Sequence, residues 1–192
     1  MRKKNNYLSL FIICITVAFS SCREREPDFF ADLKGTYFSS NQYALDEWSN
    51  HVSEVAAFVR KETINGKTDS SYVNMEHLDW NSVVKTFLET DISDRKYLGK
   101  YKFSQFDDNT DNTHDFMYIA VNKDLFTQQL LITMDIHTNK VKGIYIETEK
   151  DNLWGTTRQK LYYAPMKTIQ IQRFEKPLIG GKKDILIQYD VK

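Results

Sequence analysis

Cysteine is almost absent from this sequence of 192 residues. Its two cysteines, Cys14 and Cys22, lie near the start, and none follows them. Disulfides, cysteine-ligated zinc or iron–sulfur sites and cysteine nucleophiles are therefore excluded from the rest of the chain. Removing residues 1–21 from the 192 leaves 171, the size of one ordinary domain, so we expect a hydrophobic core to stabilise it.

An excess of positive charge is also missing. The chain has 26 basic and 26 acidic residues. Three of the basic ones, Arg2, Lys3 and Lys4, stand in residues 1–21, which contain no acidic residue, so the remainder has a formal charge of −3. This charge excludes the electrostatic footprint of a nucleic-acid-binding protein, and we predict no nucleic-acid partner.

Motifs for catalysis are missing as well. The sequence has no G-x-S-x-G, G-x-G-x-x-G, P-loop or H-E-x-x-H pattern, and none of its four histidines stands four residues from another. These absences favour a protein without enzymatic activity and predict no cofactor, no catalytic residue and no histidine metal site. A catalytic triad dispersed over several segments stays open.

The first 22 residues form a recognisable targeting segment. Three basic residues precede an apolar run from Tyr7 to Phe19, which is shorter than the roughly 20 residues that cross a bilayer. Phe19-Ser20-Ser21-Cys22 resembles the cleavage box of bacterial lipoproteins, although that box normally begins with Leu, Val or Ile. The resemblance implies cleavage before Cys22 and its acylation, as with palmitate, which anchors a protein to a membrane. An ordinary secretory signal and an uncleaved anchor stay open.

We therefore divide the chain into a signal peptide (1–21), a tether (22–34) and a single domain (35–192). In the tether, Arg23-Glu24-Arg25-Glu26 resembles the charged export tags of surface lipoproteins in Bacteroidetes-type bacteria. The expected location is the cell envelope, most simply the outer membrane, with the domain facing either the periplasm or the surface. Partners expected there are the membrane itself, through Cys22, and an envelope protein, a glycan or a lipid.

Two amphipathic helices are predicted in the first half of the domain. Ser39 and Gln42 fit a capping box, Phe38 and Tyr43 fit a hydrophobic staple, and an apolar stripe follows to about Ala57. The members of that stripe are Leu45, Trp48, Val52 and Val55. The second helix runs from an N-cap at Asp79 to about Glu89, with a stripe of Trp80, Val83, Val84, Phe87 and Leu88.

Strands account for most of the remainder. Asn65-Gly66 predicts a two-residue hairpin turn between 58–64 and 67–73, which places Val59 opposite Tyr72. From Tyr101 onward the hydrophobic period is two, and the short polar turns allow only antiparallel neighbours. We expect an α+β domain: two amphipathic helices and a hairpin packed on a meandering antiparallel sheet, either open or curled into a half-barrel.

A family resemblance covers most of this domain. The motifs occur in order as Asn65-Gly66, Asp79-Trp80, Asp91-Ile92, Tyr118-x-Ala120, Asp124-Leu125 and Leu161-x-Tyr163-x-Pro165. In that order they resemble uncharacterised lipoproteins of Bacteroidetes-type bacteria. The resemblance implies a class and a location, and it implies no activity and no catalytic residue.

Two groups of residues are candidate sites. Asp107, Asn109 and Asp111 match the first three ligand positions of a calcium loop, but Asn112 replaces the turn glycine and Tyr118 the closing glutamate. A solvated hairpin loop is therefore the favoured interpretation. Trp154, Tyr162 and Tyr163 are candidates for a surface on which a sugar stacks, with core packing as the favoured alternative.

Three functions follow as hypotheses. The first is a non-enzymatic envelope lipoprotein that binds or assembles through its sheet or hairpin surface. The second is a carrier of a lipid or other apolar ligand, which requires a continuous apolar cavity of about 300 Å³ or more. The third is an envelope hydrolase, which requires a convergent polar site that the sequence does not indicate.

Overall fold

The computed structural model describes residues 37–51, 57–74 and 80–192. All of these residues belong to one compact unit, Lys34–Lys192. The predicted signal peptide, the tether, Val52, Val55 and the Asp79 N-cap lie outside the described residues.

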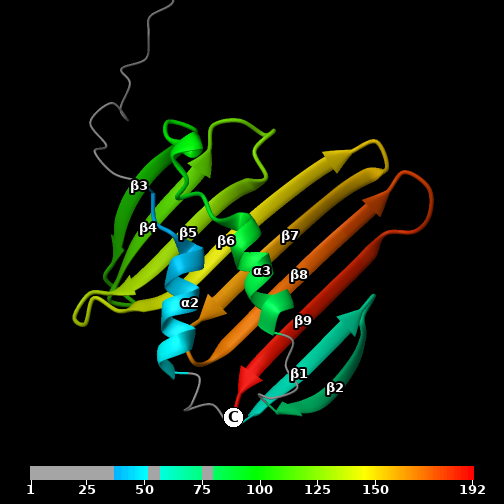
Figure 1. Ribbon diagram of the computed structural model, residues 1–192, viewed down its shortest axis with the longest axis horizontal. Coiled ribbons are helices and arrows are strands. Elements are labelled where there is room, and N and C mark those ends of the chain that lie inside the picture. The colour runs from blue at the N-terminus through cyan, green and yellow to red at the C-terminus, as the bar shows by residue number, and fades with distance from the viewer. Residues whose placement is uncertain (1–36, 52–56, 75–79) are drawn as a thin grey trace, which may run out of the picture. The chain divides into compact units, whose positions relative to one another are not determined.

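A single antiparallel sheet dominates the part of the chain that the structure describes (Figure 1). Its nine strands, within those residues, follow the order β2-β1-β9-β8-β7-β6-β5-β4-β3. Their bounds are β1 Ala57–Ile64, β2 Lys67–Asn74, β3 Tyr101–Asp108, β4 Thr113–Ala120, β5 Thr127–Asp135, β6 Val141–Asn152, β7 Gly155–Ala164, β8 Thr168–Pro177 and β9 Lys183–Val191. Strands β3 to β9 are therefore sequential neighbours, as in a meander.

The predicted α+β class is wrong, because the domain is mainly β. Against nine strands, the described residues contain two short helices, α2 (Ser40–His51) and α3 (Trp80–Thr90), and the 3₁₀ turn η3 (Arg95–Tyr97). The first hairpin does not pack on the sheet beside the helices. Instead, β1 pairs along its length with β9, which makes β1 and β2 two more strands of the same sheet. The sheet is not closed as a barrel, because its end strands β2 and β3 each pair with a single neighbour.

The hairpin itself has the predicted geometry. Val59 lies opposite Tyr72, and both turn residues have positive φ, 48° at Asn65 and 82° at Gly66. A type I′ turn requires this conformation at both central positions, and glycine and asparagine adopt it most readily. The predicted register is therefore confirmed.

Helix α2 begins at the predicted cap, Ser39, although the Gln42 side chain donates to Asp46. The Ser39 hydroxyl accepts a hydrogen bond from the Gln42 amide at 3.1 Å, and the Phe38 and Tyr43 rings lie 5.8 Å apart. The predicted apolar stripe is wrong at Leu45, which is exposed, whereas Ala44 is buried. In α3, Val83 and Phe87 are buried as predicted, but Leu88 is exposed.

The core lies between the two helices and one face of the sheet. Buried side chains from both helices and from β3, β5, β6, β7 and β8 form one cluster, and in Figure 1 both helices lie over the same face. Its members include Ala44, Val83, Phe87, Tyr101, Leu130, Ile132, Ile144, Ile146, Leu161, Tyr163 and Ile169.

We call the opposite side of the sheet the helix-free face. Side chains alternate between the faces along a strand, so the neighbours of core residues point to this side. It carries the ion pairs Lys160–Glu147 and Arg158–Glu149, with closest N···O distances of 3.4 and 3.1 Å. Both pairs are exposed, so each contributes little to stability. This face therefore meets solvent or a partner.

Candidate binding surface at two hairpin tips

The turn between β6 and β7 places two large apolar side chains in solvent. Asn152 ends β6 and pairs with Gly155 at the start of β7, so Leu153 and Trp154 are the two central turn residues. The Asn152 side-chain oxygen accepts a hydrogen bond from the Trp154 amide at 2.8 Å, which fixes the turn. Leu153 is 89% exposed and Trp154 is 81% exposed. Such positions are usually occupied by Gly, Asn, Asp or Ser. Glycine adopts positive φ without steric cost, and the side chains of the other three form hydrogen bonds with the turn backbone.

The loop between β8 and β9 also exposes two large apolar side chains to solvent. Leu178 and Ile179 directly follow Pro177, the last residue of β8, and they are 75% and 89% exposed. Gly180 comes next, with φ of 114°, a conformation that glycine adopts most readily. The loop therefore turns just after its two apolar residues.

Backbone contacts hold the two tips side by side. The Leu178 amide donates a hydrogen bond to the Trp154 carbonyl oxygen at 2.7 Å. Gly155, with φ of 141°, lies so close to β8 that an added Cβ would be 2.4 Å from the Lys176 carbonyl oxygen. Figure 1 shows the β6–β7 and β8–β9 hairpins as neighbours that end at the same side of the sheet. We call Leu153, Trp154, Leu178 and Ile179 the apolar tip.

Lysines flank the apolar tip. Lys176 precedes Leu178-Ile179 by two residues, and Lys182 and Lys183 follow. Within the described part of the chain, none of these three forms an ion pair. Residues 152–155 and 176–183, which form the two tips, carry three positive charges and no negative charge.

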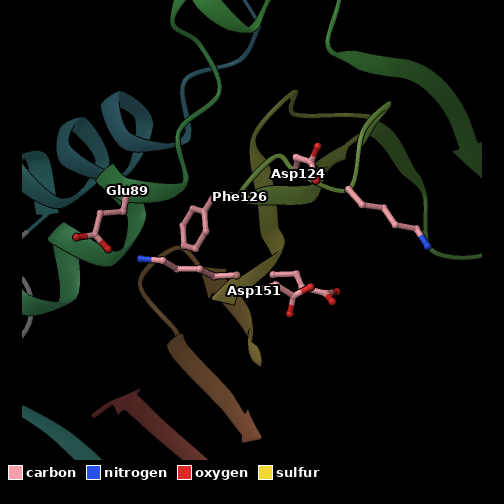
Figure 2. A pocket seen from close by; sticks show the side chains of 7 residues that line it. Glu89, Asp124, Phe126 and Asp151 are labelled. Carbon is pink, nitrogen blue, oxygen red and sulfur yellow. The ribbon is translucent and has the colours of Figure 1, made fainter. Parts of the chain in front are cut away.

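Two pockets share Glu149 and Asp151, near the end of β6. The first, of about 690 Å³, is shown in Figure 2, with Glu89 from α3 and Asp124 and Phe126 from the β4–β5 connection around it. Four carboxylates and two lysines line this pocket, so its lining has a formal charge of −2.

The second pocket, of about 580 Å³, contains Phe174 among four acidic and four basic residues. The lysines at positions 176, 182 and 183 contribute to it, which places it directly beside the apolar tip. In the described residues, no group of three or more His, Cys, Asp or Glu side chains is arranged to hold a metal ion.

The three aromatic candidates do not form one stacking surface. Trp154 is at the apolar tip, and Tyr162 is exposed on the helix-free face, where its ring covers Gly143. Tyr163, one residue later, points to the opposite face and is buried, with its ring 5.8 Å from that of Phe87. Burial chiefly raises the pKa of the Tyr163 hydroxyl well above its usual range, as expected for a core tyrosine.

The calcium candidates lie at the β3–β4 hairpin. Asp107 is on β3 and contacts the His114 ring on β4, whereas Asn109 and Asp111 are in the turn. The neighbouring Asp108 accepts hydrogen bonds from the amides of Thr110 and Asp111, which lower its pKa. This arrangement fits the interpretation of a solvated hairpin loop.

Sequence reasoning missed three of the four tip residues. The sequence singles out Trp154 but not Leu153, Leu178 or Ile179. The available signal was the presence of adjacent large apolar residues at turns, beside Asn152 and Gly155 and between Pro177 and Gly180. Local preferences that are violated in this way often mark functional positions.

The fold and this surface define a mainly β domain with one open sheet, two covering helices and an apolar, lysine-flanked tip. Comparisons with family models, with curated proteins and with solved structures gave no match. Among the described residues, no helix has the length and apolar character needed to cross a membrane.

Proposed function

We propose that this protein is a non-enzymatic, lipid-anchored lipoprotein of the cell envelope that binds a partner through its apolar tip. The observation that carries the anchor is Phe19-Ser20-Ser21-Cys22, which follows a basic segment and a short apolar run. In this proposal Cys22 is the acylated residue and the outer membrane is the location. The resemblance to lipoproteins of Bacteroidetes-type bacteria supports the same class.

The exposed apolar area supports the binding role. Four large apolar side chains, each at least 75% exposed, gather on two tips that are hydrogen-bonded to one another. Contiguous exposed apolar patches on soluble domains commonly mark interaction sites, because leaving them in water is unfavourable. The backbone contacts hold this patch in place before any partner binds.

A carrier of an apolar ligand is less well supported. The two largest of the pockets described above are lined mainly by charged side chains. A more apolar groove, with Val83, Ile171 and Ile187 in its lining, has a volume of about 260 Å³. That volume is below the roughly 300 Å³ at which ligand pockets begin.

Metabolic labelling with a fatty acid tests the anchor. We expect label in the wild-type chain and in Cys14→Ala, because Cys14 lies within the removed signal, and no label in Cys22→Ala. Equal labelling of wild type and Cys22→Ala would overturn the proposal. Phe19→Leu, which restores the usual first residue of the cleavage box, is expected to raise the labelled fraction.

A further inference from the structure

We propose that the apolar tip docks into a bilayer that contains anionic phospholipid, at the boundary between its headgroups and its acyl chains. The inference rests on the proposed function in one respect, since the anchor at Cys22 would hold the domain near a membrane.

The side chains at the tip suit a membrane interface. Trp154 has an apolar ring system with one polar N–H, and tryptophan is enriched at the boundary between headgroups and acyl chains for that reason. Leu153, Leu178 and Ile179 add aliphatic surface that gains free energy on leaving water. With exposures of 75–89%, most of this surface is available to a partner.

The shape of the tip also favours a bilayer. Sites for small molecules are concave and enclose their ligand. The residues of the apolar tip stand on a two-residue turn and on the adjoining loop at the end of the sheet (Figure 1). The hollow that Trp154 lines there has a volume of only about 150 Å³, below the roughly 300 Å³ at which ligand pockets begin. A fluid bilayer accommodates such a projection without a complementary pocket.

The backbone of the tip is ordered in advance. The Leu178–Trp154 hydrogen bond and the close approach of Gly155 to β8 fix one hairpin against the other. Docking then orders little backbone, and a pre-organised surface loses less of its binding free energy to ordering. The conformational cost of docking is therefore small.

The charge of the tip selects the lipid. Residues 176–183 contain Lys176, Lys182 and Lys183 and no acidic residue, while Glu175 and Asp184 lie one residue farther from the loop. Asp151 is the nearest acidic residue on the other hairpin. Each lysine close to an anionic membrane contributes about a fivefold gain in affinity. Neutral lipid would therefore hold the tip far less firmly.

A fluorescent probe at the tip tests the proposal in the mature, acylated chain. Because no cysteine follows Cys22, Ile179→Cys provides a single free thiol for an environment-sensitive fluorophore. Vesicles of phosphatidylcholine and phosphatidylglycerol with brominated acyl chains then quench a probe that reaches the acyl region. The matched control is Tyr72→Cys on the edge strand β2, because Tyr72 is 80% exposed and as accessible as Trp154.

We expect quenching at position 179 and none at position 72. Trp154→Ser in the Ile179→Cys chain should reduce the quenching, whereas Tyr72→Ser in the same chain should not. Replacing Lys176, Lys182 and Lys183 with Gln should weaken docking about fivefold per lysine. Vesicles of phosphatidylcholine alone should give little quenching.

Vesicle flotation in the same samples separates this proposal from the anchor. A chain that floats with the vesicles but shows no quenching at position 179 retains its anchor and overturns tip docking. Equal quenching at positions 72 and 179, or equal quenching with and without phosphatidylglycerol, also overturns it. A tip that binds a protein instead of lipid would give flotation without quenching at position 179.

Discussion

The Ser39 hydroxyl donates a hydrogen bond to the Asp91 carboxylate at 2.6 Å, across 52 residues of sequence. The same carboxylate oxygen accepts the Asn41 amide at 2.8 Å, and the other oxygen accepts the Ser93 amide at 2.7 Å. Asp91 directly follows α3, and Ser39 directly precedes α2. One side chain therefore ties the start of the first helix to the end of the second and satisfies an amide that the helix leaves unpaired.

We predict that Asp91→Ala lowers the free energy of unfolding by about 1–3 kcal/mol, because it removes a helix cap and leaves partly buried donors without an acceptor. Denaturant titration measures the change. Asp94→Ala is the control, since Asp94 is exposed and caps only the short turn η3. A loss as large in Asp94→Ala as in Asp91→Ala would contradict the role of Asp91.

Acid should weaken the same contact. Burial raises the pKa of Asp91, but the hydrogen bonds from Ser39, Ser93 and Asn41 outweigh it, so the pKa lies below its ordinary value. A carboxylate with a lowered folded-state pKa stabilises the fold above its unfolded-state pKa of about 3.9, and this contribution is lost as pH falls through the folded-state value. Stability measured from pH 7 down to strongly acid conditions should fall less steeply in Asp91→Asn than in wild type.

Gly155→Ala should disrupt the apolar tip. The new methyl group would lie 2.4 Å from the Lys176 carbonyl oxygen, and φ of 141° strains any residue other than glycine. We expect the free energy of unfolding to fall by about 2 kcal/mol or more, because the backbone clash and the backbone strain both destabilise the folded state. Gly181→Ala is the control, because an added Cβ there meets no atom within 4 Å. Thermal denaturation compares the stability of the two variants. A loss of stability in Gly155→Ala no larger than that in Gly181→Ala would refute the close approach of the tips.

Two buried tyrosines should respond differently to loss of the hydroxyl. The Tyr101 hydroxyl donates a hydrogen bond to the Thr127 carbonyl oxygen at 2.9 Å. Tyr101→Phe should therefore lower the free energy of unfolding by about 1 kcal/mol or more. The Tyr163 hydroxyl is buried and has no hydrogen-bond partner among the described residues, so Tyr163→Phe should be neutral or stabilising. Equilibrium unfolding measures both, and equal losses would be inconsistent with these contacts.

Calcium should not bind at the β3–β4 turn. One carboxylate oxygen of Asp107 is engaged with His114, and one of Asp108 accepts two backbone amides, so neither carboxylate is free to offer both oxygens to a cation without losing a contact. Isothermal calorimetry is expected to give no heat of binding, with no change in melting temperature on adding calcium. A binding isotherm abolished by Asp107→Asn would instead establish a site.

Local rules predicted the first hairpin correctly but not its place in the domain. Asn65-Gly66 determines the turn and, with it, every pair between β1 and β2. The pairing of β1 with β9 joins residues such as Phe58 and Val191, which no local pattern connects. That pairing converts a separate hairpin into two strands of the sheet, so the class is mainly β.

Local rules also predicted only part of the burial of the two helices. Periodicity predicted where α2 begins and that Val83 and Phe87 are buried in α3, but it also placed Leu45 and Leu88 in the core. Both are exposed, whereas Ala44 is buried. An apolar stripe indicates which side of a helix is hydrophobic, while the width of that stripe in contact with the sheet depends on how the helix lies across the strands.

The sequence by itself determined the hairpin turn, the cap at Ser39, the period of the strands and the absence of thiol chemistry beyond Cys22, because these depend on residues close together in the chain. Only the tertiary structure decided which strands are neighbours, and hence that Trp154 and Leu178 share one hydrogen-bonded surface. It also separated Tyr162 from Tyr163 by placing the helices over one face of the sheet. The physical reason is that contacts between distant segments depend on the packing of the whole sheet, which no short stretch of sequence specifies.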